Sequence, residues 1–167
     1  MEVHKHYNEI YEIKNFLSDE IINKMLSYID LDGEDGWISS HPGNVMNYVE
    51  GPNQDNFKSL TDKIEGDMLS FFTNITRCEK LYNIRRLKTN EFMHAHSDLG
   101  PNNDDQNLLF GIVMYLNDDF EGGELNYVDL NIKIKPTKGS LVIHKSTYVH
   151  EVLKVISGKR YCITSFI

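Results

Sequence analysis

The hydrophobic positions in the first half of the chain recur at the spacing of an α-helix. Between residues 16 and 30 the apolar side chains share one face, and Ser18 stands before two acidic residues as a candidate N-cap. A second stretch, about residues 53–75, repeats this spacing. Both stretches predict helices that pack their apolar faces on a core. Residues 32–52 between them hold four of the eleven glycines and predict a long irregular connection.

From residue 81 onward, short apolar runs with partial alternation replace the helical spacing. Seven or so such runs, separated by tight turns, predict an antiparallel sandwich or jelly roll. Helices from the first half would cover one of its sheets. The expected fold class is therefore mainly β with α, a double-stranded β-helix (jelly roll) with N-terminal helices packed on one sheet. The expected strands are 82–87, 108–116, 125–128, 132–135, 140–144, 149–155 and 161–167.

The length and composition fit one domain, 1–167, with a helical support region at 1–80 and a jelly-roll core at 81–167. The net charge of −8 disfavours nucleic acid as a partner and suits a cationic peptide or protein better. No apolar run is long enough for a membrane span, and the first residues lack the apolar core of a secretory signal. We therefore expect a cytoplasmic location and no membrane partner. Cys78 and Cys162 are expected to be reduced thiols.

Three residues form a candidate metal site. His96 and Asp98 are two positions apart, so in a strand they project from the same face. His150 follows in another predicted strand, which a sandwich fold can bring alongside. Two imidazoles and one carboxylate make the facial triad that holds Fe(II) and leaves coordination positions open. Taken alone, an H-x-D pair is a weak signal, because a surface histidine beside an acid explains it equally well.

Arg160, ten residues beyond His150, is a candidate anion-binding residue. A turn at Gly158 lets both face one cavity, whereas Lys159 has the opposite strand parity and is expected to point away. A guanidinium buried in an apolar barrel is costly unless it meets an anion. A dicarboxylate that binds iron at one end and arginine at the other would remove that cost.

The remaining histidines have other expected roles. His94 shares parity with His96, so it is able to point into the pocket, and the pair is similar to cupin metal sites. A cupin needs a further carboxylate, and none follows at the expected place. We expect His94 to be a non-ligand near the mouth of the site. Structural or surface roles are expected for His4, His6, His41 and His144.

The order of these motifs resembles the prolyl 4-hydroxylase-like branch of the 2-oxoglutarate/Fe(II) dioxygenases. The similarity spans about residues 82–167 and starts with the H-x-D pair at 96–98. It continues with Tyr-Leu-Asn at 115–117, the E-G-G-E turn at 121–124 and the segment 135–142 that precedes His150. Two tyrosines common in this family are replaced by Met93 and Leu87, and a usual glycine is Asn90. Polar contacts near the iron-proximal end of 2-oxoglutarate must then come from elsewhere, or the pocket is more apolar.

The resemblance implies an enzyme that hydroxylates a C–H bond with O2 and 2-oxoglutarate and releases succinate and CO2. Loops 37–52 and 99–107 would border its mouth, and ascorbate is expected as a reductant. The expected substrate is a prolyl residue in a peptide or protein, with a free amino acid or other small molecule as the alternative. A jelly-roll module that binds a ligand without catalysis is the remaining possibility. The implied roles are Fe(II) ligands for His96, Asp98 and His150, and 2-oxoglutarate contacts for Arg160, Tyr115 and Thr164.

Overall fold

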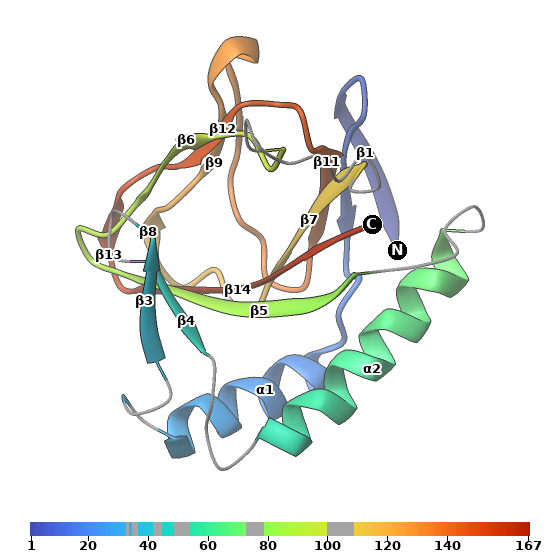
Figure 1. Ribbon diagram of the computed structural model, residues 1–167, viewed down its shortest axis with the longest axis vertical. Helices are drawn as coiled ribbons and strands as arrows, with labels where there is room; N and C mark the ends of the chain where they lie inside the picture. The colour runs from blue at the N-terminus through green and yellow to red at the C-terminus, as the bar shows by residue number, and fades with distance from the viewer. Residues whose placement is uncertain (33, 35–36, 42–44, 49–53, 73–78, 100–108) are drawn as a thin grey trace.

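The protein has three layers, which are two helices, a large antiparallel sheet and a smaller antiparallel sheet (Figure 1). The computed structural model describes residues 1–32, 34, 37–41, 45–48, 54–72, 79–99 and 109–167. Both helices lie on the outer face of the larger sheet, and the smaller sheet faces its other side. The expected jelly roll with helices packed on one sheet is confirmed.

The helices are α1 (Asp19–Asp32) and α2 (Gln54–Phe71). The larger sheet runs in the order β1 (Glu2–Tyr7), β2 (Ile10–Lys14), β11 (Leu141–Lys145), β7 (Phe110–Tyr115), β14 (Lys159–Phe166), β5 (Glu79–Lys88), β4 (Val45–Tyr48) and β3 (Trp37–His41). The smaller sheet runs in the order β10 (Ile132–Ile134), β9 (Leu125–Tyr127), β12 (His150–Val152) and β6 (Met93–His96). A two-stranded pair joins β13 (Val155–Ser157) to β8 (Glu121–Gly122), and a 3-10 turn spans Val128–Leu130.

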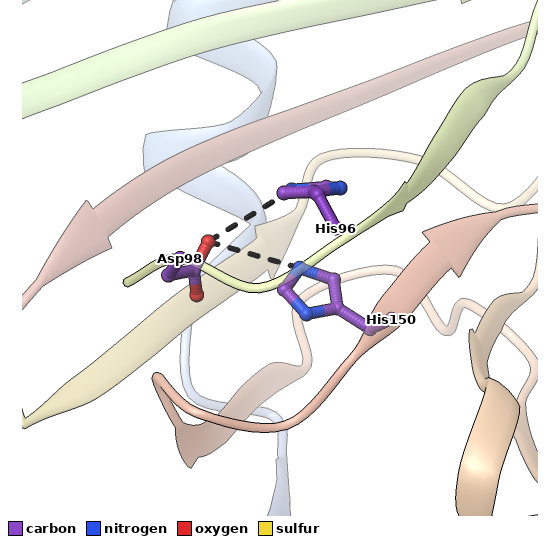
Figure 2. Close-up of side chains that lie close together, drawn as sticks. All are labelled: His96, Asp98 and His150. Carbon is purple, nitrogen blue, oxygen red and sulfur yellow. Dashed lines mark ion pairs between the residues drawn. The ribbon is translucent and has the colours of Figure 1, made fainter. Parts of the chain in front are cut away.

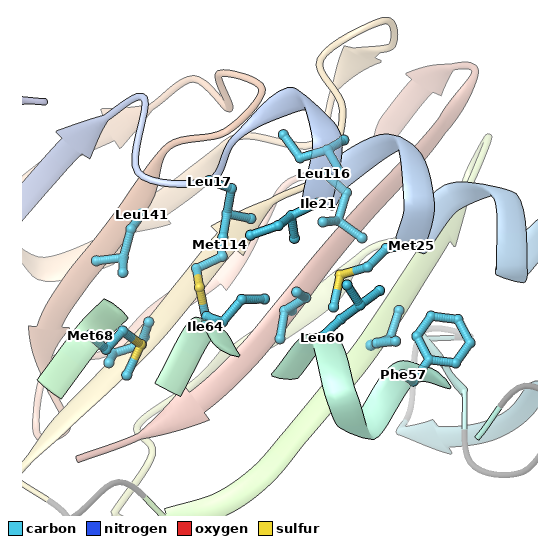
Figure 3. Close-up of a cluster of buried hydrophobic side chains, with 14 of the residues drawn as sticks. Leu17, Ile21, Met25, Phe57, Leu60, Ile64, Met68, Met114, Leu116 and Leu141 are labelled. Carbon is cyan, nitrogen blue, oxygen red and sulfur yellow. The ribbon is translucent and has the colours of Figure 1, made fainter. Parts of the chain in front are cut away.

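The predicted helices form where their apolar stripes meet the sheet. Ser18 caps α1, because its Oγ accepts a hydrogen bond from the amide of Ile21 at 3.3 Å. Side chains from both helices interlock with the outer face of the larger sheet (Figure 3). This layer holds the main apolar core, which includes Ile21, Met25, Ile64, Met68, Met114 and Leu141.

Alternation along the central strands separates this core from the interior of the jelly roll. On β7, Ile112 and Met114 face the helices, whereas Val113 and Tyr115 lie between the two sheets. On β14, Ile163 faces the helices and Cys162 lies between the sheets. The side chains between the sheets are therefore the ones available to line a site.

The first half of the chain contains more strand than its hydrophobic pattern predicted. The hairpin of β1 and β2 continues the larger sheet beside β11, with Ile13 opposite Leu141. The side chains of β1 are mostly exposed, so pairing with β2 forms the strand without an apolar signature. The connection expected to be irregular at 32–52 contains β3 and β4, which pair with each other, and β4 also pairs with β5.

The two loops expected at the mouth lie partly (37–52) or almost wholly (99–107) outside the described residues. Of the segment 37–52, the structure describes the two strands 37–41 and 45–48. Of the segment 99–107, it describes Leu99 alone. Neither helix in the described part of the chain has the length and apolar character needed to cross a membrane.

Candidate metal centre and active site

His96, Asp98 and His150 come together on the inner side of the smaller sheet. His96 ends β6 and His150 begins β12, and the two residues are direct partners in this antiparallel pair. Asp98 lies in the loop just after β6. Figure 2 shows the three side chains pointing toward one another. One candidate ligand atom from each lies within 4.8 Å of the other two, and Oδ1 of Asp98 is 3.9 Å and 3.8 Å from Nε2 of His96 and His150.

Backbone carbonyls orient both imidazoles. Nδ1 of His96 lies 2.8 Å from the carbonyl oxygen of His94, and Nδ1 of His150 lies 3.0 Å from that of Tyr148. Because a carbonyl oxygen only accepts hydrogen bonds, Nδ1 carries the proton in each neutral ring. The lone pairs of both Nε2 atoms therefore face Asp98, as metal ligation requires.

Asp98 is fixed by its own backbone and by a buried histidine. Its amide donates to the carbonyl of Ser146 at 3.0 Å, and its Oδ2 lies 3.0 Å from Nε2 of His144. Burial acts to raise the pKa of Asp98, but the hydrogen bond from His144 and the nearby imidazoles outweigh burial and lower it. The carboxylate is therefore ionised at neutral pH, with Oδ1 directed at the other two ligand atoms.

His144 was expected to be structural or on the surface, and its contact with Asp98 was not anticipated. The side chain is buried on β11, with 1% of its surface exposed. Its imidazole lies 4.5 Å from that of His150 between ring centroids. Burial, reinforced by the neighbouring His144, lowers the pKa of His150 to about 4. His150 is therefore neutral at physiological pH and its Nε2 is free to bind a metal.

Gly111 on β7 makes room for the pair formed by Asp98 and His144. A Cβ at this position would lie 2.7 Å from Nε2 of His144 and closer still to Oδ2 of Asp98. Only glycine permits this approach of strand and side chains. A glycine within an otherwise apolar run, Phe110–Tyr115, was the sequence signal for this contact.

A cavity of about 220 Å³ adjoins the three residues and lies between the two sheets. Its walls include His96, Asp98 and His150 on one side and Arg160 and Thr164 of β14 on the other. Arg160 is 3% exposed, and its Nη1 donates to the sulfur of Cys162 at 3.1 Å. Within the described residues no carboxylate lies within 4.0 Å of this guanidinium, so its charge lacks a counterion.

Tyr115 beside Arg160, and Thr164 four residues further along β14, provide further polar groups without hydrogen-bond partners among the described residues. The guanidinium carbon of Arg160 lies 5.1 Å from the centre of the Tyr115 ring. Burial raises the pKa of Tyr115 to about 12, so its hydroxyl keeps its proton. Three buried atoms, Tyr115 Oη, Thr164 Oγ1 and Arg160 Nε, have no hydrogen-bond partner in the described part of the chain. Such a set fits an anion with several acceptor oxygens, and the histidine and carboxylate donors fit a ferrous ion.

The parity argument for His94 was wrong, because β6 contains an irregularity. Val152 pairs with Met93 while His150 pairs with His96, so β6 has one residue more than β12 between these pairs. Met93 consequently faces the cavity, and His94 is exposed with its ring against Phe92 at 4.8 Å. Asn90 adopts a left-handed φ of 73°, which explains how it replaces glycine. Leu87 and Met93 both line the cavity.

Comparison with known proteins connects this geometry to a family. The model of the 2OG-Fe(II) oxygenase superfamily matches residues 82–167. A PKHD-type hydroxylase of Prochlorococcus marinus (strain MIT 9215) is 28% identical, over 92% of this chain and 77% of the relative.

Two solved structures share the fold. A viral collagen prolyl hydroxylase from Paramecium Bursaria Chlorella virus-1, in complex with 2OG, has a TM-score of 0.69 at 22% identity, covering 95% of this chain and 94% of the other. A prolyl hydroxylase from Trichoplax adhaerens, in complex with a peptide fragment of a hypoxia inducible factor, has a TM-score of 0.70 at 20% identity, covering 95% and 83%. With the family match over half of its length, the chain belongs to the 2OG-Fe(II) oxygenase superfamily.

Proposed function

We propose that His96, Asp98 and His150 bind Fe(II). The observation that carries the proposal is the convergence of two imidazole Nε2 atoms and one carboxylate oxygen within 4.8 Å, with both Nδ1 atoms engaged by carbonyl groups. Bound there, the metal supplies the site at which O2 is activated, while the protein fixes the ligands and keeps positions open. His144 and Gly111 act indirectly, since they hold the carboxylate of Asp98 in place.

Arg160 is proposed to bind the distal carboxylate of 2-oxoglutarate. Its buried guanidinium forms charge-assisted hydrogen bonds with a carboxylate, and the hydroxyl of Tyr115 would donate a hydrogen bond to the same group. Thr164 lines the cavity and is a further candidate contact of the co-substrate. The Arg160→Ala variant is expected to weaken 2-oxoglutarate binding by roughly 30-fold or more, because one partner of a buried charge pair is lost. Fe(II) affinity is the control, and it should stay unchanged. Equal affinity of both proteins for 2-oxoglutarate would remove this role from Arg160.

The proposed reaction is hydroxylation of a prolyl residue in a peptide or protein. Support comes from solved structures that share the fold, because several of them are prolyl hydroxylases and the Trichoplax adhaerens enzyme is in complex with a peptide. A free amino acid or other small molecule is the second candidate, favoured by the modest volume of the cavity, about 220 Å³. Arg160, Tyr115 and Thr164 would orient the co-substrate, and the apolar side chains of Leu87 and Met93 would exclude water.

Succinate formation tests the reaction and the substrate class together. Protein is supplied with Fe(II), O2, 2-oxoglutarate and ascorbate, which keeps the iron ferrous. Proline-containing peptides, matched peptides with alanine in place of proline, and free L-amino acids are compared. Succinate release that depends on proline in the peptide is the expected result, whereas stimulation by a free amino acid selects the second candidate. A protein that binds iron and 2-oxoglutarate but never turns over would instead be a ligand-binding module.

A further inference from the structure

A second, partly buried arginine lines the cavity, and the roles proposed above do not use it. Arg85 lies on β5 opposite Cys162 of β14, so its side chain shares the inner face with that of Leu87. Its Nη1 contacts the sulfur of Met93 at 3.9 Å, and its Nε is buried without a hydrogen-bond partner among the described residues. No carboxylate of that part of the chain lies within 4.0 Å of it.

The neighbouring Arg86 shows how this fold satisfies a structural arginine. Its side chain points to the opposite face of β5, where Nη1 and Nη2 donate to the two carboxylate oxygens of Glu34 at 3.0 Å and 2.8 Å. The guanidinium also stacks 4.5 Å from the ring of Trp37. Among the described residues, the hydrogen-bond partner of the Arg85 side chain is a thioether, which is a weak acceptor, so packing in this part of the chain gives no reason for a charge there.

The two cavity arginines also differ in how well their surroundings support the charge. Burial lowers the pKa of Arg85, while the nearby Cys162 and Asp98 only partly oppose this. Burial also acts against Arg160, but Cys162 and Tyr115 more than offset it and raise its pKa. A guanidinium remains protonated in either setting. The surroundings of Arg85 therefore stabilise its positive charge less than those of Arg160 do. An anion that binds in the cavity would gain the larger electrostatic stabilisation beside Arg85.

The position of Arg85 matches a gap in the polar lining of the cavity. Leu87 and Met93 stand where the resemblance leads us to expect tyrosines, so this wall lacks hydroxyl donors. Arg85 lies two residues from Leu87 on the same strand face and touches Met93 directly. Its guanidinium is the group on this wall that is equipped to hold a carboxylate in two-point contact.

We propose that Arg85 binds a carboxylate inside the cavity, separately from the one held by Arg160. This inference rests on the proposed function, and the carboxylate has two possible sources. One is the iron-proximal carboxylate of 2-oxoglutarate, and the other is the carboxylate of a free amino acid bound as the substrate.

The charge balance of the cavity favours the substrate as the source. Arg85 and Arg160 contribute two positive charges, and Asp98 contributes one negative charge. Fe(II) adds two positive charges and 2-oxoglutarate adds two negative charges, so the lining formed by the described residues keeps one positive charge after both have bound. A substrate carboxylate would neutralise it.

Calorimetric titration of Fe(II)-loaded protein without O2 separates these sources. The wild type, Arg85→Gln and Arg160→Gln are titrated first with 2-oxoglutarate, then, once saturated, with each free L-amino acid and its carboxamide. Lys159→Gln serves as a control, because Lys159 is an exposed cation beside Arg160. We expect Arg85→Gln to weaken one carboxylate ligand by roughly tenfold or more. If Arg85→Gln loses affinity for 2-oxoglutarate, the carboxylate that Arg85 binds belongs to the co-substrate. If it loses affinity for an amino acid that the wild type binds better than the corresponding carboxamide, the carboxylate belongs to the substrate.

A stability measurement keeps the test informative if the glutamine variant folds poorly. Arg85→Met removes the charge and retains most of the side-chain length. Replacing a partly buried cation that lacks a counterion among the described residues should leave the unfolding temperature of the ligand-free protein unchanged or higher. A marked decrease in that temperature would indicate a structural role and overturn the proposal.

Titration results also separate this inference from the proposed function. The inference fails if Arg85→Gln binds 2-oxoglutarate and every amino acid within twofold of wild type while Arg160→Gln loses 2-oxoglutarate. If Arg160→Gln binds 2-oxoglutarate like the wild type as well, the proposed function fails with it.

Discussion

At the scale of single residues, the chemistry of the site depends on which imidazole nitrogen carries a proton. The carbonyls of His94 and Tyr148 hold the Nδ1 protons of His96 and His150, and this leaves both Nε2 atoms as acceptors. Burial then keeps His150 neutral well below physiological pH. As the pH falls, the stability of the metal-free protein should therefore decrease before Nε2 of His150 becomes protonated and unable to bind a metal.

The depressed pKa of His150 predicts acid sensitivity of the metal-free protein. Burial lowers this pKa from 6.5 to about 4, so between these values the unfolded chain binds a proton that the folded chain does not. The free energy of unfolding should therefore fall as the pH falls from 6.5 to 4, by about 3 kcal/mol at most. Urea unfolding across this range measures the effect. In His150→Asn the free energy of unfolding should depend less on pH. An equally steep pH dependence in this variant would show that His150 is not its cause.

At the scale of secondary-structure elements, the site depends on how three strands meet. Pairing of β6 with β12 places His96 beside His150, and β7 supports Asp98 through Gly111. The sequence predicted the first relation in part, because His150 fell in a predicted strand that a sandwich fold can bring beside the H-x-D pair, but no strand was predicted at Met93–His96 itself. It did not predict the extra residue in β6, since nothing in Met93–His96 distinguishes regular from irregular pairing. That irregularity is why His94 points away from the cavity.

Substitution of Gly111 tests the support that β7 gives to the metal site. In Gly111→Ala the new methyl group overlaps the carboxylate of Asp98 and the imidazole of His144, so this pair must move. Disturbing a group that orients a metal ligand typically lowers metal affinity about 10–100-fold. Fe(II) titration under anaerobic conditions measures this change. Gly66→Ala on α2, where nothing lies within 4 Å of the added carbon, is the matched control and should keep wild-type affinity.

The other features that the sequence did not predict depend on contacts between residues far apart in the chain. His144 and Asp98 are separated by 46 positions, so their hydrogen bond has no local signature. Arg85, Arg86 and Lys88 are close together in the sequence, but alternation along β5 turns Arg85 into the cavity while the other two pair with Glu34. The strands β1 and β2 were missed because pairing within the sheet, rather than propensity, determines them.

At the scale of the whole molecule, stability and chemistry lie on opposite faces of the larger sheet. The helices and the main core cover one face, and the cavity opens on the other. The support region expected at 1–80 contributes strands to this sheet as well as the helices. Residues in the helical layer should therefore affect unfolding without affecting ligand binding.

Truncation of Ile64 tests this separation. Ile64 is fully buried between α2 and the sheet, so Ile64→Ala should lower the free energy of unfolding by about 2–5 kcal/mol. Fe(II) affinity of the folded variant should remain that of the wild type. Lys63→Ala, at the exposed neighbouring position, should change stability by no more than about 0.5 kcal/mol. A large loss of iron affinity in Ile64→Ala would mean that the two faces are coupled.

The central claim is that His96, Asp98 and His150 bind Fe(II) together with 2-oxoglutarate. The most direct test is an anaerobic titration of metal-free protein with Fe(II) and 2-oxoglutarate. The visible charge-transfer band of the iron chelate is the signal that is measured. We predict that the band appears with wild-type protein and is lost in His96→Ala, whose fold is checked by circular dichroism. Absence of the band in well-folded wild-type protein, or its persistence in His96→Ala, would contradict the claim.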